Sequence, residues 1–322
     1  MGQVIFNKGL SGLKSLLKGY QSVFMVYDRN VEEYADKIAG AADIQCSMSI
    51  ETGEENKSIE TVMDIERFLL ALGADRDSFV LAVGGGVTTD LVGFAASIYK
   101  RGIRFGFVPT SLLSQVDAAI GGKTAANLDS YKNMIGTFAE ADFTYICSDC
   151  LKTLPEREFR SGAAEMLKSF IISGGPVYEK AVDFLKRWNR KEKWTAKELG
   201  ELVEAAAKVK MEIVAKDPFE KGVRRKLNLG HTFAHAIEWY EQIDEIPEPL
   251  THGEAVAIGI IQAARLTNEA LADKLAEDFA ACGLPVELPY SVEFLLPAME
   301  KDKKNRDGGI KFVLVYKIGD VR

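Results

Sequence analysis

The chain has 322 residues and a formal net charge of −7, with 47% hydrophobic and 27% charged residues. This composition is ordinary for a soluble globular protein and excludes a disordered chain, a collagen-like repeat and a disulfide-based scaffold. The acidic balance argues against a protein that holds nucleic acid on a broad basic surface, although a small basic pocket can lie inside an acidic shell.

The chain carries no sequence signal for export or membrane insertion. The first 20 residues contain no long apolar segment of the kind found in signal peptides. The longest apolar stretches, 79–83 and 255–264, are too short or too interrupted by glycine to cross a bilayer. We therefore expect a cytoplasmic protein with neither a membrane nor a nucleic acid as partner.

In the first half, apolar runs typical of strands alternate with patterns typical of helices. The strand-like runs are 22–27, 43–48, 79–83 and 104–108, and the helix-like segments are 31–39, 58–72 and 91–101. Such alternation predicts a parallel sheet wrapped by helices.

A run of three glycines, Gly84 to Gly86, follows one of these strands and precedes a helix. Glycines there let the backbone approach a phosphate at the positive end of the helix. The run is not the GxGxxG fingerprint, because Thr89 occupies the last glycine position. Nucleotide binding and a plain tight turn both remain open on this evidence. Asp90 is expected to cap the helix that follows.

From about Leu154 the pattern changes to long helices. They are predicted at 158–172, 177–188, 196–215, 230–240 and 253–282, with one late strand at 310–316. The sequence therefore predicts an α/β domain at 1–153 followed by a mainly α-helical domain at 154–322. At about 150 residues per domain, two domains also fit the length.

Cys147 and Cys150 form an isolated CxxC pair. A zinc or redox centre would be one use of such a pair, but small buried side chains are the interpretation we favour, because no second pair accompanies it.

The three histidines are unusually informative because the chain has only three. His231 and His235 are four residues apart and so share one face of a helix, and His252 lies at the start of another helix. With Glu165 they form a set of ligands suited to catalytic zinc. The alternative is that each is an ordinary polar residue at a helix end. The clustering of all three beside glycines favours the metal.

Several cationic side chains lie beside glycine, asparagine or helix starts. Each alone is typical of a solvated surface side chain, but together they would suit a small polyanion bearing phosphate and carboxylate groups. They are Arg101, Lys123, Lys132, Lys168, Lys210, Arg224, Lys303 and Lys304.

Seven segments, taken together and in order, closely resemble the 3-dehydroquinate synthase family. The segments read GGGVTTDLVGFAASIYKRG, VPTSLLSQVDAAIGGKTAAN, KNMIG, LKTLPEREFRSGAAEMLK, RRKLNLGHTFAHAIE, THGEAVAIG and DKK. The resemblance runs from about Glu54 to Lys304 and so covers most of the chain. The resemblance implies a Rossmann-like NAD-binding α/β domain and a helical metal-binding domain. It also implies a homodimer, bound NAD and one divalent metal, usually Zn²⁺, with Co²⁺ as an alternative.

The resemblance also implies a role for individual residues. The metal ligands would be Glu165, His231 and His252, and His235 would contact the substrate instead. The other substrate contacts would be Asp117, Arg101, Lys123, Asn133, Lys168, Lys210, Arg224, Asn228 and Lys303. The NAD contacts would include Asp28, Glu54, Lys57, Gly85, Gly86, Asp90, Thr110, Ser111, Lys132 and Thr153.

The implied reaction converts 3-deoxy-D-arabino-heptulosonate 7-phosphate, a small anionic sugar phosphate, to 3-dehydroquinate and phosphate in the shikimate pathway. It proceeds by transient oxidation with NAD, phosphate elimination, re-reduction and intramolecular aldol closure. A metal would polarise the oxygen being oxidised.

Three alternatives compete with this interpretation. One is a cyclase acting on another sugar phosphate or an amino analogue. A second is a polyol dehydrogenase that releases NADH. The third is a non-catalytic NAD-binding protein, which would be expected to have lost site residues.

Overall fold

The computed structural model describes residues 2–129, 131–301 and 309–322. The chain divides into two compact units, Met1–Leu154 (unit 1) and Pro155–Arg322 (unit 2).

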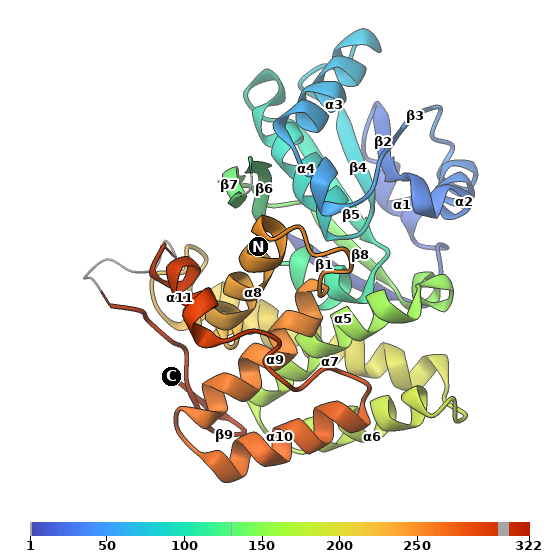
Figure 1. Ribbon diagram of the computed structural model, residues 1–322. Coiled ribbons are helices and arrows are strands. Elements are labelled where there is room, and N and C mark those ends of the chain that lie inside the picture. Colours follow the sequence, from blue (N-terminus) through green and yellow to red (C-terminus); the bar gives the residue numbers. More distant parts are fainter. Residues whose placement is uncertain (1, 130, 302–308) are drawn as a thin grey trace. The chain divides into compact units, whose positions relative to one another are not determined.

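Unit 1 is built on a parallel sheet (Figure 1). Its strands are β1 (Gln3–Asn7), β2 (Val23–Asp28), β3 (Cys46–Ile50), β4 (Phe79–Gly84), β5 (Arg104–Pro109) and β8 (Phe143–Cys147). They lie in the order β1-β8-β5-β4-β2-β3, and each neighbouring pair is parallel. The central strand β4, FVLAVG, is buried along its whole length, as expected of a strand covered on both faces.

Helices cover both faces of this sheet, with α1 (Leu13–Leu17) and α2 (Glu32–Ala42) on one side and α3 (Ile59–Ala71) and α4 (Gly86–Ile98) on the other (Figure 1). Side chains of successive strand residues point to opposite faces of the sheet. Phe24 and Val26 of β2 pack in the core with α3 and α4, whereas Met25 and Tyr27 pack with α1 and α2. The predicted α/β architecture is therefore confirmed.

The sheet contains a topological switch point. The chain passes from β2 to β3 on one side, and then returns to place β4 on the other side of β2. The loops that follow β2 and β4 therefore diverge at the carboxyl end of the sheet, where open α/β sheets bind ligands.

A separate antiparallel hairpin of β6 (Lys123–Leu128) and β7 (Tyr131–Phe138) completes unit 1. The sequence pattern did not predict it. The hairpin packs against α4, where a Cβ at Gly93 would come within 2.5 Å of Thr124. Glycine at this position is what allows the close packing. Short helical turns are η1 (Arg29–Val31), η2 (Glu54–Asn56), η3 (Tyr99–Arg101), η4 (Ser114–Ala118) and η5 (Ser148–Thr153).

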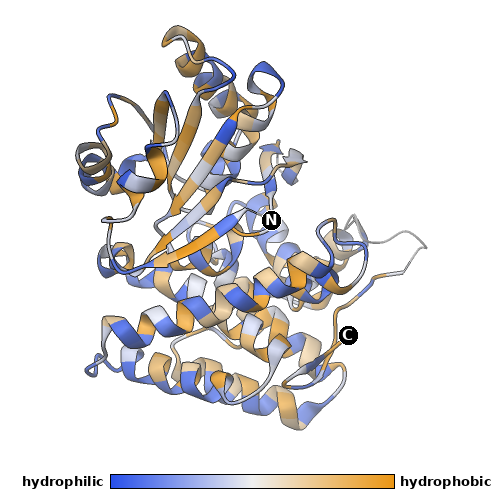
Figure 2. Ribbon diagram, turned by 180° about the vertical axis from the view of Figure 1, so that it is seen from behind, coloured by the Kyte–Doolittle hydropathy of each residue, from blue (hydrophilic) through white to orange (hydrophobic). Residues whose placement is uncertain are grey.

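Unit 2 is mainly helical, as predicted. Its elements are α5 (Glu156–Ser173), α6 (Val177–Asn189), α7 (Ala196–Lys216), η6 (Val223–Asn228), α8 (His231–Ile243), α9 (His252–Arg265), α10 (Glu269–Ala281), α11 (Val292–Lys301), β9 (Val315–Lys317) and β10 (Asp320–Val321). Helix α9 packs against α5, α8 and α10, and α5 and α9 are the most deeply buried. The other helices alternate hydrophobic and hydrophilic residues, whereas the strands of the parallel sheet in unit 1 are mostly hydrophobic (Figure 2). Among the described residues, no helix is both long and apolar enough to cross a membrane.

The structure corrects several predicted boundaries. Helix α4 begins at Gly86 rather than at Leu91, so Asp90 lies inside the helix and does not cap it. The helix predicted at 253–282 is two helices, because the Asn268 side chain caps α10 by accepting the Leu271 N–H. The strand predicted at 43–48 is β3 at Cys46–Ile50, and the late strand is limited to Val315–Lys317 in β9.

Candidate functional site

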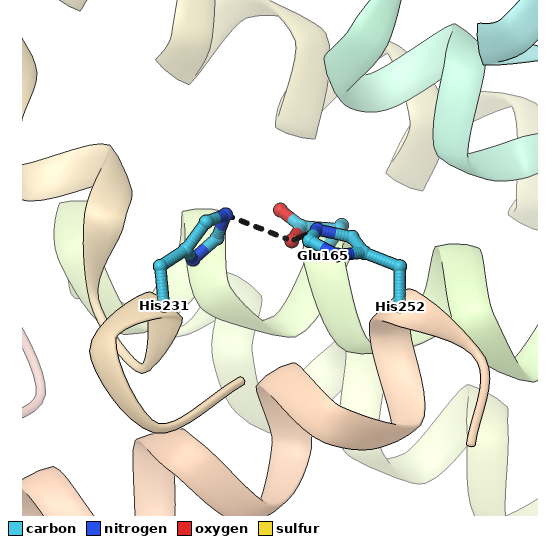
Figure 3. A group of neighbouring side chains, drawn as sticks. All are labelled: Glu165, His231 and His252. Atoms are coloured by element: carbon cyan, nitrogen blue, oxygen red, sulfur yellow. Dashed lines mark ion pairs between the residues drawn. The ribbon is translucent and has the colours of Figure 1, made fainter. Parts of the chain in front are cut away.

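Three potential metal ligands from three helices of unit 2 converge at one point (Figure 3). Glu165 lies in the middle of α5, and His231 and His252 are the first residues of α8 and α9. One ligand atom from each lies within 4.8 Å of the other two. It is the only such group of three or more histidine, cysteine or acidic residues within the described part of the chain.

Glycines beside the two histidines allow the helices to meet this closely. A Cβ on Gly253 would lie 2.0 Å from the backbone oxygen of Ser161, so α9 rests directly on α5. Gly230, which caps α8 with φ +81°, would place a Cβ 2.8 Å from the backbone nitrogen of Ile260 in α9. The glycines thus bring His231 and His252 toward Glu165.

Hydrogen bonds orient both imidazoles. His231 Nδ1 lies 3.2 Å from the carbonyl oxygen of Leu229, and His252 Nδ1 lies 3.1 Å from Oε1 of Glu238. A carbonyl and a carboxylate only accept, so both histidines carry their proton on Nδ1. Their Nε2 atoms then face Glu165, at 3.8 Å and 3.5 Å from its Oε1, and each becomes a metal donor when it carries no proton.

Glu165 is the clearest sign that a cation belongs here. Its carboxylate is fully buried, and neither oxygen has a hydrogen bond of good geometry from the residues that the structure describes. The Lys168 ammonium, itself 1% exposed, forms an ion pair with Oε2. A buried carboxylate costs several kcal/mol unless it is compensated. One carboxylate and two neutral imidazoles are a donor set that suits Zn²⁺ and leaves a position open, so the residues fit a divalent metal.

The protonation of His252 depends on the same carboxylates. Burial lowers its pKa, but the charges of Glu238 and Glu165 outweigh burial and raise the pKa to about 10. A cation that binds Nε2 must displace this proton.

His235 lies beside the three ligands but outside their group. Its ring centre is 5.3 Å from that of His231 and 6.4 Å from that of His252, and its side chain is exposed. The spacing of four residues from His231 therefore places it next to the candidate metal centre without bringing its nitrogens among the converging atoms.

The polar candidates of unit 2 lie on elements that pack around α5. Lys168 is in α5, Lys210 in α7, and Arg224 and Asn228 in η6, and these elements contact one another. Lys168, Lys210 and Arg224 are at most 7% exposed, which is unusual for cationic side chains. Lys303 lies outside the described residues.

Two of these side chains are held by the loop after α7. The Arg224 guanidinium donates to the carbonyl of Pro218, and the Asn228 amide donates to Glu220. The loop therefore orients both side chains of η6.

In unit 1, most predicted dinucleotide contacts follow the carboxyl ends of parallel strands. Asp28 ends β2, and Glu54 lies in η2 after β3. Gly85 and Gly86 form the turn from β4 into α4. Thr110 and Ser111 follow β5, and Thr153 ends η5 after β8. This edge includes the switch point, so the geometry is that of a nucleotide-binding α/β sheet.

A polar network joins further candidates in unit 1. The buried Lys57 ammonium forms an ion pair with Asp90 at 2.7 Å and donates to Oδ1 of Asn133 at 2.6 Å. Asn127, which the sequence did not single out, accepts the N–H of Asn133 at 2.8 Å and donates to Glu54 Oε1 at 2.9 Å. Asn133 has φ +55°, so Asn127 supports a residue in the left-handed region.

The remaining candidates are more exposed. Arg101 ends η3 with φ +71°, Asp117 lies in the π-helical turn η4, and Lys123 and Lys132 lie on the hairpin strands β6 and β7. Cys147 and Cys150 are buried, in accord with the interpretation as small core side chains.

The chain matches two family models over most of its length. Residues 47–161 match the model for the 3-dehydroquinate synthase N-terminal domain, and residues 162–305 match the model for the C-terminal domain. A 3-dehydroquinate synthase of Legionella pneumophila (strain Corby) is 41% identical over 290 residues, which cover 87% of this chain and 77% of that protein.

Two solved structures share the whole fold. One is 2-epi-5-epi-valiolone synthase from Streptomyces hygroscopicus subsp. jinggangensis 5008 with NAD⁺ and Zn²⁺ bound, with a TM-score of 0.89, 28% identity, and coverage of 100% of this chain and 92% of that one. The other is 2-deoxy-scyllo-inosose synthase complexed with carbaglucose-6-phosphate, NAD⁺ and Co²⁺, with a TM-score of 0.86, 26% identity, and coverage of 99% and 90%.

Proposed function

The chain belongs to the 3-dehydroquinate synthase family, and from this premise we propose that it converts 3-deoxy-D-arabino-heptulosonate 7-phosphate to 3-dehydroquinate and phosphate. The observation that carries the proposal is the convergence of Glu165, His231 and His252 on one point. A protein that only bound NAD would have no need to bury a carboxylate between two oriented imidazoles.

In this proposal, Glu165 and the Nε2 atoms of His231 and His252 hold a divalent metal. Zn²⁺ or Co²⁺ would act as a Lewis acid on the substrate oxygen that is oxidised. The structural relatives described above contain one or the other of these ions. Lys168 forms an ion pair with this carboxylate in a buried setting, and we propose that its ammonium also contacts the anionic substrate.

Unit 1 would bind NAD, which accepts a hydride and later returns it. Its contacts would come from Asp28, Glu54, Lys57, Gly85, Gly86, Asp90, Thr110, Ser111, Lys132 and Thr153. Asp28 suits a ribose hydroxyl, because its carboxylate ends β2 at the switch point. The amino end of α4, with Gly85 as its cap, suits the pyrophosphate. Residues 1–153 would thus form the NAD-binding domain and residues 154–322 the metal- and substrate-binding domain.

The substrate is proposed to be a small phosphorylated sugar acid. Its phosphate and its carboxylate are both negatively charged, and each needs cationic partners. Its contacts would be Arg101, Asp117, Lys123, Asn133, Lys168, Lys210, Arg224, Asn228, His235 and Lys303. The buried guanidinium of Arg224 and the buried ammonium groups of Lys168 and Lys210 lose little hydration when an anion binds, since folding has already removed it. Such groups orient the substrate for the reaction.

The experiment that tests this function incubates the protein with the heptulosonate phosphate, NAD and Zn²⁺ and follows phosphate, 3-dehydroquinate and NADH together. The expected result is equal amounts of the two products and no net NADH. The amino analogue of the substrate serves as the control, and faster phosphate release from it would assign the chain to a different cyclase. Accumulation of NADH without phosphate release would indicate a dehydrogenase.

A further inference from the structure

We propose that Glu238 is a positioning residue for the candidate metal centre and that its carboxylate holds His252 with Nε2 turned toward Glu165. This inference rests on the proposed function, since it takes Glu165, His231 and His252 as the metal ligands. It adds a residue that binds neither metal nor substrate but acts through a ligand.

Helix geometry places Glu238 where it can do this. Glu238 follows His231 by seven residues in α8, so the two side chains lie two turns apart on the same face of the helix. The residue is 8% exposed, and its Oε1 lies 3.1 Å from Nδ1 of His252, the first residue of α9. Helix α8 therefore supplies one ligand directly and the support of another.

The two imidazoles are supported by acceptors of different strength. His231 donates to the backbone carbonyl of Leu229, whereas His252 donates to a carboxylate. A charged acceptor forms a shorter and stronger hydrogen bond and makes the opposite ring nitrogen a better donor to a metal.

A neighbouring carboxylate shows what a purely structural glutamate looks like in the same helix. Glu241 lies three residues after Glu238 and is 3% exposed. It accepts the backbone N–H of Leu250 at 2.9 Å and the hydroxyl of Tyr290 at 2.9 Å. Its partners are a loop and a tyrosine rather than a ligand histidine, so Glu241 provides a matched control for Glu238.

The test compares Glu238→Gln, Glu238→Asp and Glu241→Gln with the unaltered protein, without NAD or substrate. The dissociation constant of Zn²⁺ is measured by competition with a chromogenic chelator, and bound Co²⁺ is followed by its visible absorption spectrum. Loss of an outer-shell partner typically weakens metal affinity about 10- to 100-fold. We expect Glu238→Gln and Glu238→Asp both to lose Zn²⁺ affinity by this factor and to shift the Co²⁺ absorption bands. Glu238→Asp should do so because its shorter side chain does not reach Nδ1 of His252. Glu241→Gln should stay within about 2-fold of the unaltered protein.

Each outcome has a distinct meaning. Equal affinity in all the proteins, or equal losses in Glu238→Gln and Glu241→Gln, would overturn the positioning role while leaving the metal centre intact. Failure of the unaltered protein to bind Zn²⁺ or Co²⁺ would overturn the metal assignment of the proposed function as well. Thermal unfolding of the metal-free proteins shows whether each variant is folded. Because Glu238→Asp keeps the negative charge, it still tests the positioning role if Glu238→Gln fails to fold.

Discussion

At the scale of single residues, the candidate metal centre depends on which nitrogen of each histidine is free. His231 and His252 both use Nδ1 for a hydrogen bond to oxygen and turn Nε2 toward Glu165. His235, on the same helix, is exposed and lies beside them. The contacts therefore distinguish the two proposed metal ligands, His231 and His252, from His235, which is proposed to contact the substrate.

This separation predicts different effects of two alanine substitutions. His231→Ala removes a ligand and should lower bound metal to a small fraction of one per chain. His235→Ala should leave bound metal nearly unchanged and lower turnover by about 100-fold or more, since it removes a group proposed to contact the substrate. Elemental analysis of the purified proteins measures the first effect, and a phosphate assay measures the second. Equal metal loss in both variants would contradict the division.

A second residue-scale prediction concerns Glu66 in α3. Burial raises the pKa of its carboxyl to about 7, from an ordinary value of 4.5. The unfolded chain thus loses this proton at lower pH than the folded chain does, so stability falls as the pH rises from about 4.5 to 7. Glu66→Gln cannot ionise and should gain stability relative to the unaltered protein over this range.

The gain should reach about 1 kcal/mol above pH 7, which allows for partial exposure of the side chain. Denaturant unfolding at pH 5 and pH 8 measures it. Glu60→Gln in the same helix changes an exposed carboxylate and serves as the control. A difference between Glu66→Gln and the unaltered protein that is the same at both pH values would contradict the assignment.

At the scale of elements, close helix packing sets the position of His252. Gly253→Ala would place a methyl group 2.0 Å from the backbone oxygen of Ser161, a contact that only movement of α9 away from α5 can relieve. We expect a loss of about 2–4 kcal/mol in the free energy of unfolding and weaker metal binding.

Gly40→Ala is the matched control for this substitution. Gly40 lies in α2, and a Cβ there would meet no atom within 4 Å. Alanine in a helix is favoured over glycine by up to about 1 kcal/mol, so this variant should be as stable as the parent or more so. Denaturant unfolding of the two variants compares them. If Gly253→Ala had the stability and metal affinity of Gly40→Ala, the proposed tight packing of α9 on α5 would be wrong.

Much of the fold could be predicted because the signals are local. The strands at 22–27 and 79–83 are apolar runs bounded by polar residues, and helix α3 begins after Ser58, a typical cap. Strands β6 and β7 were missed because KTAANL and YKNMIGTF lack a long apolar run and are stabilised by pairing and by packing on α4. The division between α9 and α10 was missed because Asn268, its only strong local signal, stands within a long helical pattern.

As with the fold, only part of the candidate site could be predicted from the sequence. Glu165, His231 and His252 could be proposed because ligand types are few and their helix context is recognisable. Asn127 and Glu238 could not, because their importance arises from contacts with other elements. For Glu238 one signal was present: a charged residue seven positions after His231, between apolar Ile237 and aromatic Trp239.

At the scale of the whole molecule, the acidic net charge of −7 describes the chain as a whole and not its buried polar residues. Lys168, Lys210 and Arg224 are buried in a protein with more acidic than basic residues. Buried cations in an acidic protein are compatible with an anionic substrate, provided that these cations face it.

The family premise also predicts a homodimer. Sedimentation velocity at micromolar concentration should give a mass near twice the 35.4 kDa of the chain. A single species at the mass of one chain, unchanged over a tenfold range of concentration, would contradict this prediction.

We propose that Glu165, His231 and His252 form the metal centre of a phosphate-releasing cyclase. The most direct measurement is phosphate release from the heptulosonate phosphate by chelator-treated protein, before and after addition of Zn²⁺, with bound metal determined in the same samples. We expect release to be lost with the metal and to return in proportion to bound Zn²⁺, up to one ion per chain. Full release by protein that contains no metal would contradict it.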